Sequence, residues 1–408
     1  MKEIKVITLK NGLKLVLLRN TTMRFYYFDI LIKFGCINDE VLVNQEKIKI
    51  PTGCAHFLEH ILLEKSKYGN LFEVFARDDT RFNGRTYYDH TDYYIDCVKN
   101  FKTNVKKLII ALHDKKFKEE DILTVKEPIK EEIQGNLKND LNKLDEEKFK
   151  SLFFNYPEEN ILGNLSDLEN ITYDKLVLSH DLFYVPSNET IFLAGNFKID
   201  DMIKYIENIY NKLSFNSYEL DTSKNELAEV KRKEYSFKSK TNTNYTKISY
   251  KISLKDFTPF ERVKLDFYVD FFNDDNFLCV DKLSEENISF HRIDYDIRYV
   301  ADYLILSYGI YTDYKDKFLD LIKDKINNKE FREDKFNTFK KRKLVDLLIR
   351  RDDNIYFIDC YLDNINLFSY YDYDKLSDIE DLSFTECKEM INKLDFSNYT
   401  INSFYKEN

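Results

Sequence analysis

Two histidines and a glutamate stand within five residues of one another, and their spacing suits metal chemistry. His56 and His60 are four positions apart, and Glu59 lies directly before the second histidine. In a helix, residues four apart project from one face about one turn from each other, so both imidazoles can reach one tetrahedral zinc ion. Glu59 can lean over the same face and accept a proton from water at the metal. The spacing therefore predicts a zinc site with its own general base.

The same spacing could also arise on an ordinary amphipathic helix whose histidines bind nothing. The whole chain contains only six histidines, and two of them stand at this spacing with a glutamate in the position of a base. That coincidence favours the metal site over the bland interpretation. The pattern HxxEH is the inverted zincin motif, which is typical of metallopeptidases.

A third metal ligand is expected from an acidic residue on a second helix, predicted over residues 118–137. One stripe of that helix is apolar: Ile122, Val125, Ile129 and Ile133. At about 100° per residue, Glu132 falls at the edge of this stripe, whereas Glu127 and Glu131 point toward solvent. Without the two histidines, Glu131 and Glu132 would be interpreted as a solvated charge pair. With them, Glu132 is the predicted third ligand.

Turn signals and apolar periodicity place these helices in a mixed fold. Asn11-Gly12 separates two apolar runs and predicts a hairpin. In the first half, strands are expected at 25–34, 80–87, 93–98 and 190–194, and helices at 54–63, 71–77, 101–114, 118–137 and 200–213. In the second half, helices are expected at 259–272, 314–326 and 336–348, and strands at 290–297, 302–311 and 399–404. Both halves mix strands and helices, which predicts an α+β (mixed α/β) fold and leaves an internal duplication open.

The length of 408 residues exceeds what one hydrophobic core usually serves. Apolar density falls and charge rises over residues 216–244, where we expect the connection between two domains. The expected organisation is a catalytic zinc-binding domain over 1–218, a linker over 219–244 and a homologous, non-catalytic domain over 245–408.

Composition excludes some classes of function. Charged residues make up 33% of the chain and the net charge is −10, so a nucleic-acid partner is not expected. No apolar run is long enough to cross a bilayer, and the first residues do not resemble a signal peptide. The six cysteines are scattered without paired spacing and are expected to be reduced and buried. We therefore expect a cytoplasmic protein without membrane or nucleic-acid partners.

The chain resembles the pitrilysin (insulinase) family of inverted-motif zinc peptidases. In that family HxxEH is followed downstream by a glutamate ligand in a Glu-Glu-Ile-like sequence, and residues 130–133 read Lys-Glu-Glu-Ile, with Glu132 at the matching position. Four residues resemble the family strand whose edge pairs with the peptide substrate: Asn83, Gly84, Arg85 and Thr86. Residues 93–94, 184–188 and 193–197 add weaker matches, so the resemblance covers most of residues 1–213.

The resemblance implies two similar domains, each a mainly antiparallel sheet flanked by helices, which form one half of a clamshell chamber. The short bacterial and processing-peptidase type, which this chain resembles in length, assembles the chamber from two chains. The implied function is a zinc endopeptidase with one Zn2+ per chain, acting on peptides or a leader segment as a homodimer or as a heterodimer with a related chain. The alternative is a non-catalytic or weakly active partner subunit of a heterodimeric peptidase.

Three features depart from the family pattern. Val125 stands where the family often has a second acidic residue on the ligand helix, and Pro128 lies within that helix, where it could cause a kink. The family's Arg and Tyr near the substrate carbonyl have no clear match among the available residues Arg292, Tyr295, Arg298 and Tyr299.

The remaining histidines and one cysteine near the motif have ordinary interpretations. His90 is expected in a turn, and three isolated histidines are expected at the surface or in the core: His113, His180 and His291. Cys54 is expected to pack the start of the motif helix instead of reaching a metal.

Overall fold

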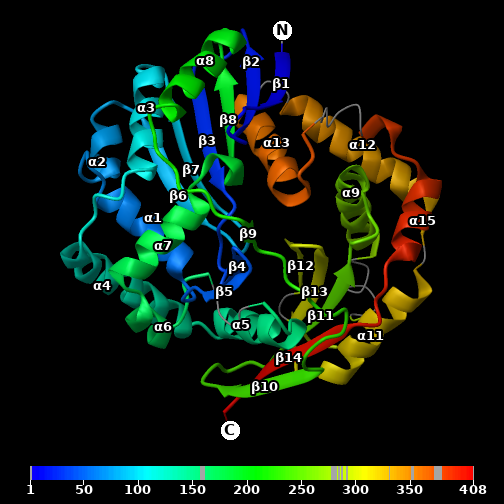
Figure 1. Cartoon of the computed structure of the whole chain (residues 1–408). Coiled ribbons are helices and arrows are strands. Elements are labelled where there is room, and N and C mark those ends of the chain that lie inside the picture. The colour runs from blue at the N-terminus through cyan, green and yellow to red at the C-terminus, as the bar shows by residue number, and fades with distance from the viewer. Residues whose placement is uncertain are drawn as a thin grey trace. The chain divides into compact units, whose positions relative to one another are not determined.

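The computed structural model describes residues 2–156, 161–276, 283, 285, 288–290, 293–329, 331–350, 353–371 and 379–407 (Figure 1). The chain forms two compact units. The first unit comprises Met1–Asn139 and Asn155–Asn225, and the second comprises Asp140–Phe154 and Glu226–Asn408. The segment 140–154 therefore belongs to the second unit although it lies within the first half of the sequence.

A six-stranded sheet forms the centre of the first unit. Its strands are β1 (Lys2–Thr8), β2 (Lys14–Asn20), β3 (Tyr26–Ile32), β6 (Arg81–Thr86), β7 (Thr91–Cys97) and β8 (Glu189–Gly195), in the order β1-β2-β8-β3-β7-β6. Only β2 and β8 pair in parallel within this sheet. The hairpin predicted at Asn11-Gly12 is confirmed, since Gly12 adopts a φ of 90° between β1 and β2, a left-handed conformation that glycine tolerates.

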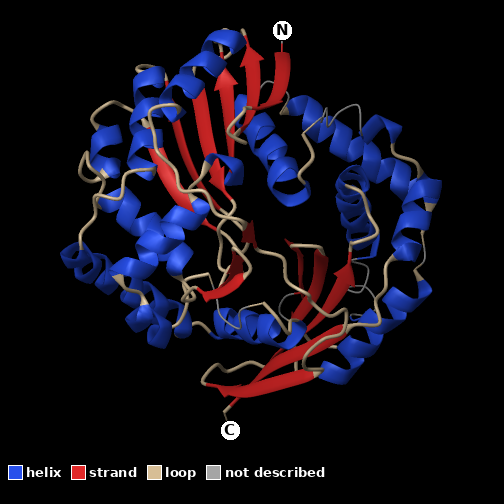
Figure 2. Cartoon of the chain, viewed as in Figure 1, coloured by secondary structure: helices blue, strands red, loops and turns tan. Residues whose placement is uncertain are grey.

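Helices pack against this sheet to form the core of the first unit (Figure 2). They are α1 (Cys54–Glu64), α2 (Leu71–Ala76), α3 (Phe101–Leu112), α4 (Glu119–Leu137), α6 (Leu165–Asn170), α7 (Tyr173–Phe183) and α8 (Ile199–Tyr210), with a 3-10 turn at Pro186–Asn188. A small sheet adds β4 (Glu40–Val43), β5 (Glu46–Lys49) and β9 (Leu220–Asp221). The predicted helices over 54–63, 101–114 and 118–137 correspond to α1, α3 and α4, of which α1 and α4 carry the site residues.

A five-stranded sheet forms the centre of the second unit. Its strands are β10 (Glu234–Ser239), β11 (Tyr245–Ser253), β12 (Ile293–Val300), β13 (Tyr303–Tyr311) and β14 (Tyr399–Lys406), in the order β10-β14-β11-β13-β12. The helices are α5 (Asp140–Leu152), α9 (Pro259–Asn276), α11 (Lys315–Asn328), α12 (Glu333–Ile349), α13 (Asn354–Phe368) and α15 (Phe384–Lys393). Thus β9 and β10 both lie in the stretch that the sequence analysis treats as a linker.

The two sheets repeat one topology. The order β2-β8-β3-β7-β6 corresponds strand by strand to β10-β14-β11-β13-β12. In each series the first pair is parallel and every later pair is antiparallel. Helix α1 follows β3 and helix α9 follows β11, so they are counterparts, as are α4 and α12. The units are therefore two similar α+β domains, and the duplication that the sequence left open is present in the fold.

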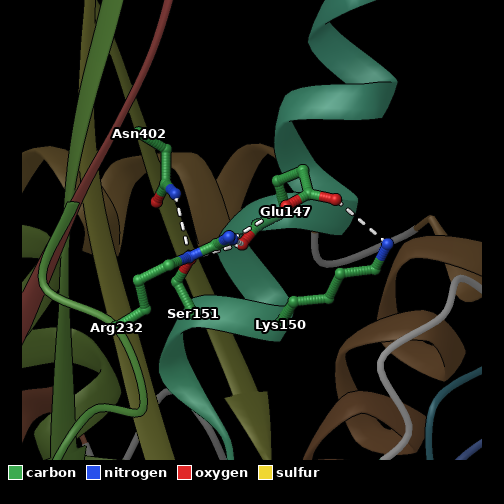
Figure 3. A network of polar contacts seen from close by, with 5 residues as sticks. All are labelled: Glu147, Lys150, Ser151, Arg232 and Asn402. Atoms are coloured by element: carbon green, nitrogen blue, oxygen red, sulfur yellow. Dashed lines mark hydrogen bonds and ion pairs between the residues drawn. The ribbon is translucent and has the colours of Figure 1, made fainter. Parts of the chain in front are cut away.

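Helix α5 is fastened to the second sheet by polar contacts, shown in Figure 3. Arg232 reaches Glu147 at 2.8 Å and donates to Ser151 Oγ at 3.0 Å, and the amide of Asn402 in β14 donates to the same hydroxyl at 3.2 Å. Lys150 pairs with Glu147 at 3.0 Å. Arg232 and Asn402 are distant from α5 in sequence, so apolar periodicity within the segment could not assign this helix to the second unit.

Two further expectations concern cysteines and membranes. Five cysteines are free, as expected. Four of them are also buried as expected, whereas Cys360 is partly exposed, and Cys279 lies outside the described residues. Among the described residues, the helices are all too short or too polar to cross a membrane.

Candidate metal centre

Helix α1 places the HxxEH residues between the sheet and α4. Its other positions are the apolar Phe57, Leu58, Ile61 and Leu62, which are buried in the core of the first unit. The helix begins after Gly53, which has a φ of 76°, and a Cβ at this position would lie 2.4 Å from the carbonyl oxygen of Leu162. A side chain there would therefore shift the start of the helix that carries the motif.

The structure brings His56, His60 and Glu132 together. Glu132 Oε2 lies 3.7 Å from His56 Nε2 and 3.9 Å from His60 Nε2. One ligand atom from each residue lies within 4.8 Å of the others, and the two imidazole rings are 4.6 Å apart between centroids. The His56 side chain is 8% exposed and the Glu132 side chain 47% exposed, so the cluster opens toward solvent on the α4 side.

Helix α4 orients Glu132 as its helical phase predicts. The apolar stripe is buried, with Val125 fully inaccessible and Ile133 at 1% exposure, while Glu131 next to Glu132 is exposed. Pro128 lies within α4, which continues unbroken from Glu119 to Leu137. Val125, which stands where the family often has an acidic residue, is buried in the core of the first unit.

Glu59 points from α1 toward the edge of the sheet. Its Oε2 accepts a hydrogen bond of 2.6 Å from the Thr86 hydroxyl. Burial raises the pKa of the Glu59 carboxyl above its ordinary value, and Asp92 and Glu132 add to the rise, against the opposing effects of Thr86 and His60. A carboxyl group with a raised pKa can both accept a proton and return it near neutral pH.

The four residues from the β6 resemblance play different parts. A Cβ on Gly84 would lie 2.9 Å from Leu63 Cδ1 and 3.1 Å from Glu59 Cγ, so this glycine allows β6 to approach α1. Arg85 donates two hydrogen bonds, of 3.0 and 2.9 Å, to Asp92, and Asn83 is half-buried. Thr86 donates a hydrogen bond to Glu59, and this contact between residues 27 apart was not predicted from the sequence. No local signal could have revealed it.

The donor set fits a zinc ion. Burial, with a contribution from the charge of His60, lowers the pKa of His56 to about 3, so this imidazole is neutral at ordinary pH, as a metal ligand must be. Two imidazole nitrogens and one carboxylate oxygen are the ligands of the catalytic zinc sites that leave a fourth position open. The arrangement has the chemistry of a hydrolytic metal centre with Glu59 beside it.

Two other histidines of the first unit are core residues, as expected. His113 Nε2 lies 2.8 Å from Glu189 Oε1, and both side chains are fully or almost fully buried. His180 Nε2 donates to the carbonyl oxygen of Leu112 at 2.7 Å. Among the described residues, neither histidine belongs to the group formed by His56, His60 and Glu132.

The positions of His90 and Cys54 also agree with their ordinary interpretations. His90 precedes β7 in the short connection from β6 and contacts Asp89 at 2.7 Å. The thiol of Cys54 is buried at the start of α1 and lies 3.4 Å from the Ser179 hydroxyl. His291 and Arg292 lie outside the described residues.

The second-unit residues considered for the substrate carbonyl are engaged within that unit. Arg298 pairs with Asp296 at 2.8 Å and with Asp145 at 3.3 Å. Tyr299 donates a hydrogen bond of 3.0 Å to Asp266, and Tyr295 is 43% exposed. These contacts agree with the absence of a clear match to the family pattern.

A cluster of two histidines and one glutamate that could hold a metal ion, with a neighbouring carboxylate, is found here on a duplicated α+β fold. This combination is typical of the inverted-motif metallopeptidases. Residues 15–164 match the model of the insulinase family, peptidase family M16. Residues 170–342 match the model described as the peptidase M16 inactive domain. The chain belongs to the insulinase family, peptidase family M16.

Two curated relatives carry the name zinc protease. The uncharacterised zinc protease YmfH of Bacillus subtilis is 28% identical over 198 residues, which cover 46% of this chain and 44% of the relative. The zinc protease PqqE of Helicobacter pylori is 25% identical over 198 residues, which cover 47% of this chain and 43% of the relative. The matched segments thus span less than half the length of these relatives.

Solved structures share the fold over the whole chain. An M16-like peptidase from Alicyclobacillus acidocaldarius superposes with a TM-score of 0.87 and 18% identity, covering 100% of this chain and 99% of that one. A protease from Helicobacter pylori gives 0.79 and 14%, covering 99% and 100%. A peptidase M16 inactive domain from Pseudomonas fluorescens gives 0.78 and 13%, covering 100% and 98%.

Proposed function

We propose that this chain is a zinc-dependent endopeptidase in which His56, His60 and Glu132 bind one zinc ion and Glu59 is the general base. The observation that carries the proposal is the convergence of three ligand atoms within 4.8 Å of one another, beside Glu59 on the same helix. Membership of peptidase family M16 and the names of the two zinc-protease relatives support it.

The chemistry divides between the metal and the protein. When bound, zinc would act as a Lewis acid that polarises the scissile carbonyl and lowers the pKa of water, so that the water can lose a proton and attack the carbonyl carbon. Glu59 accepts the proton from that water and passes it to the leaving amine. The Thr86 hydroxyl holds the carboxylate at 2.6 Å, which fixes its direction. Burial, which raises the pKa of Glu59, suits the return of the proton.

Peptide substrates would add to the sheet at β6. This strand ends the order β1-β2-β8-β3-β7-β6, so one of its edges has no neighbouring strand in the sheet. An extended peptide can pair with such an edge through main-chain hydrogen bonds. We assign this role to the backbone of residues 83–86, because the side chain of Thr86 at its end contacts Glu59 and brings the paired peptide beside the proposed base.

The proposed organisation is a catalytic domain over 1–218, a linker over 219–244 and a non-catalytic domain over 245–408. In the described part of the second unit, no His, Cys, Asp and Glu side chains gather as His56, His60 and Glu132 do. We propose that the chain works as a dimer, with itself or with a related chain, whose second copy helps to enclose the site and exclude water.

A non-catalytic partner subunit is the second candidate. It is favoured by the buried Val125 in place of an acid on the ligand helix and by the inactive-domain model over residues 170–342. This candidate predicts that the purified chain alone does not cleave peptides, even when it is loaded with zinc and concentrated.

The test compares three variants of the full chain. Wild type purified with added zinc should carry about one zinc per chain, and His56→Ala should lose it. Glu59→Gln should keep the metal and lose hydrolysis of a quenched fluorescent peptide library, while Glu131→Gln, an exposed neighbour of the site, should behave as wild type. Elemental analysis without zinc in the wild type contradicts the proposal. If the chain alone binds zinc without hydrolysis and a related chain restores activity, Glu59→Gln decides: loss of the restored activity supports the proposal, and unchanged activity supports the partner-subunit alternative.

A further inference from the structure

Glu64, the last residue of α1, lies against the outer nitrogen of a proposed zinc ligand. Its Oε1 is 3.3 Å from His60 Nδ1, whereas His60 Nε2 faces Glu132 Oε2 at 3.9 Å. The two nitrogens of one ring therefore face two different carboxylates. A neutral imidazole has one N–H and one lone pair, so an Nδ1–H that donates to Glu64 leaves the lone pair on Nε2, toward Glu132.

We propose that Glu64 is a positioning residue that fixes the tautomer and the ring orientation of His60 for zinc binding. This inference rests on the proposed function and adds to it a carboxylate outside the ligand set. Hydrogen-bonded carboxylates of this kind orient metal-binding histidines and raise their basicity. The helical spacing of four residues puts Glu64 on the same face as His60, one turn farther along α1.

The other positions around the cluster offer no carboxylate for this role among the described residues. On the ligand helix, the position where a second acid could stand holds Val125, which is fully buried. The Nδ1 atom of His56 is buried and has no hydrogen-bond partner among the described residues. Glu64 is thus the carboxylate that contacts a histidine of the cluster from the side opposite Glu132.

Helix stability does not account for a glutamate at this position. A carboxylate in the last turn of a helix is unfavourable with the helix dipole. A contact between side chains four apart stabilises a helix only weakly. The α1 helix has no basic residue in its last turn to offset the charge of Glu64. The contact with His60 is better explained by metal binding than by local stability.

Zinc affinity is the first test, measured on the full chain by competition with a chromophoric chelator. Glu64→Ala should weaken zinc binding by about 10–100-fold, and Glu64→Gln, which keeps a weaker acceptor, should lie between this variant and wild type. The matched control is Glu131→Gln, which removes a charge beside the site without touching a ligand histidine and should stay within about two-fold. Equal zinc affinity of Glu64→Ala and wild type overturns the proposal.

The tautomer of His60 is the second test and needs no metal. The chain has six histidines, so 15N-histidine labelling with His60→Gln for assignment can resolve the ring nitrogens by NMR. In zinc-free wild type, His60 should carry its proton on Nδ1, and in Glu64→Ala it should shift toward Nε2–H. An Nε2–H tautomer in wild type overturns the inference while zinc binding, and the proposed function, can still stand. A wild type that binds no zinc overturns both.

Discussion

Each unit packs two corresponding helices against each other, but the polar side chains on the two helix pairs differ. In the first unit α1 packs against α4, and in the second their counterparts α9 and α12 pack together. On α1 and α4, the imidazoles of His56 and His60 and the carboxylate of Glu132 lie close together. On α9 and α12, Asp270 pairs with Lys343 at 2.7 Å and Asp274 pairs with Arg342 at 2.7 Å. The first helix pair brings candidate metal ligands together. In the second pair, lysine and arginine side chains neutralise the carboxylates.

A second contact is repeated with altered residues. In the first unit a carboxylate on α1 accepts a hydrogen bond from the edge strand, Glu59 from Thr86 at 2.6 Å. In the second unit a carboxylate on α9 accepts one from the counterpart edge strand, Asp266 from Tyr299 at 3.0 Å. Beside Asp266 lies a cavity of about 260 Å³, which Asp270 and Lys343 also line. Both units therefore have a hydrogen bond from the edge strand to a helix carboxylate, whereas among the described residues the converging histidines are found only in the first unit.

The difference shows what a metal site requires beyond the fold. Ammonium and guanidinium groups already neutralise the carboxylates of α9, so a metal ion there would have to displace them. In the first unit the carboxylate of Glu132 faces two imidazole nitrogens at 3.7 and 3.9 Å, beyond direct hydrogen-bond distance and suited to an ion between them. Both units share the scaffold, and among the described residues only the first carries side chains that gather into a cluster that could hold a metal ion.

The largest expected effect separates the two repeated carboxylates. Glu59→Gln should lower kcat for peptide hydrolysis by about 100-fold to 10,000-fold, because it removes the general base, and zinc content should stay unchanged. The matched change in the second unit, Asp266→Asn, removes the counterpart contact and should leave kcat within about two-fold. Both are measured with a fluorogenic peptide below the melting temperature of each variant. A comparable loss of kcat in both variants would break the functional difference between the units.

The placement of the site residues could be predicted where the contacts are local, and their metal-binding and catalytic roles stay predictions. His56, Glu59 and His60 follow from spacing on one helix, and the structure finds Glu132 at the phase that an ideal helix predicts. Glu64 was missed although its four-residue spacing from His60 was visible in the sequence. The contact of Thr86 with Glu59 could not be inferred, because it depends on how β6 lies against α1.

Long-range packing explains the other omissions. Helix α5 directly follows α4 in sequence, yet it belongs to the second unit. Its anchors include the buried Lys251, whose ammonium donates to the Leu152 carbonyl at 2.9 Å and to Glu226 at 2.6 Å. Periodicity within a segment reports which face is apolar, and it carries no information about which sheet that face will cover.

Effects of intermediate size are expected from two glycine substitutions, which should change the stability of the first unit in opposite directions. Gly84→Ala would place a Cβ 2.9 Å from Leu63 Cδ1 and 3.1 Å from Glu59 Cγ, so β6 or the base must shift. We expect a loss of about 1–3 kcal/mol of stability and about a ten-fold fall in kcat. Gly135→Ala on α4, where nothing lies within 4 Å, should stabilise the helix by roughly 0.5–1 kcal/mol without changing kcat. Thermal melts and steady-state kinetics measure both, and a neutral Gly84→Ala would mean that β6 does not need this close approach.

The smallest effect concerns pH, and the two units should respond in opposite directions. In the first unit, burial opposes protonation of His113, but Glu189 and the Ile109 carbonyl raise its pKa above the ordinary 6.5. The folded chain then holds this proton more tightly than the unfolded chain. The stabilising contribution is therefore complete below about pH 6.5 and is lost as the pH rises through the folded pKa.

In the second unit the buried Lys148 has the opposite linkage. Burial lowers its pKa from 10.5 to about 8, against the attraction of Asp145. Between about pH 8 and 10.5 the unfolded chain binds more protons at this group, so its contribution makes stability rise with pH. Urea unfolding from pH 5.5 to 9.5, followed by tryptic susceptibility at sites in each unit, should show the first unit weakening as the second gains. His113→Asn should flatten the first profile and Lys148→Met the second. Profiles that move together in wild type and stay unchanged in both variants would show that these two buried groups do not set the pH response.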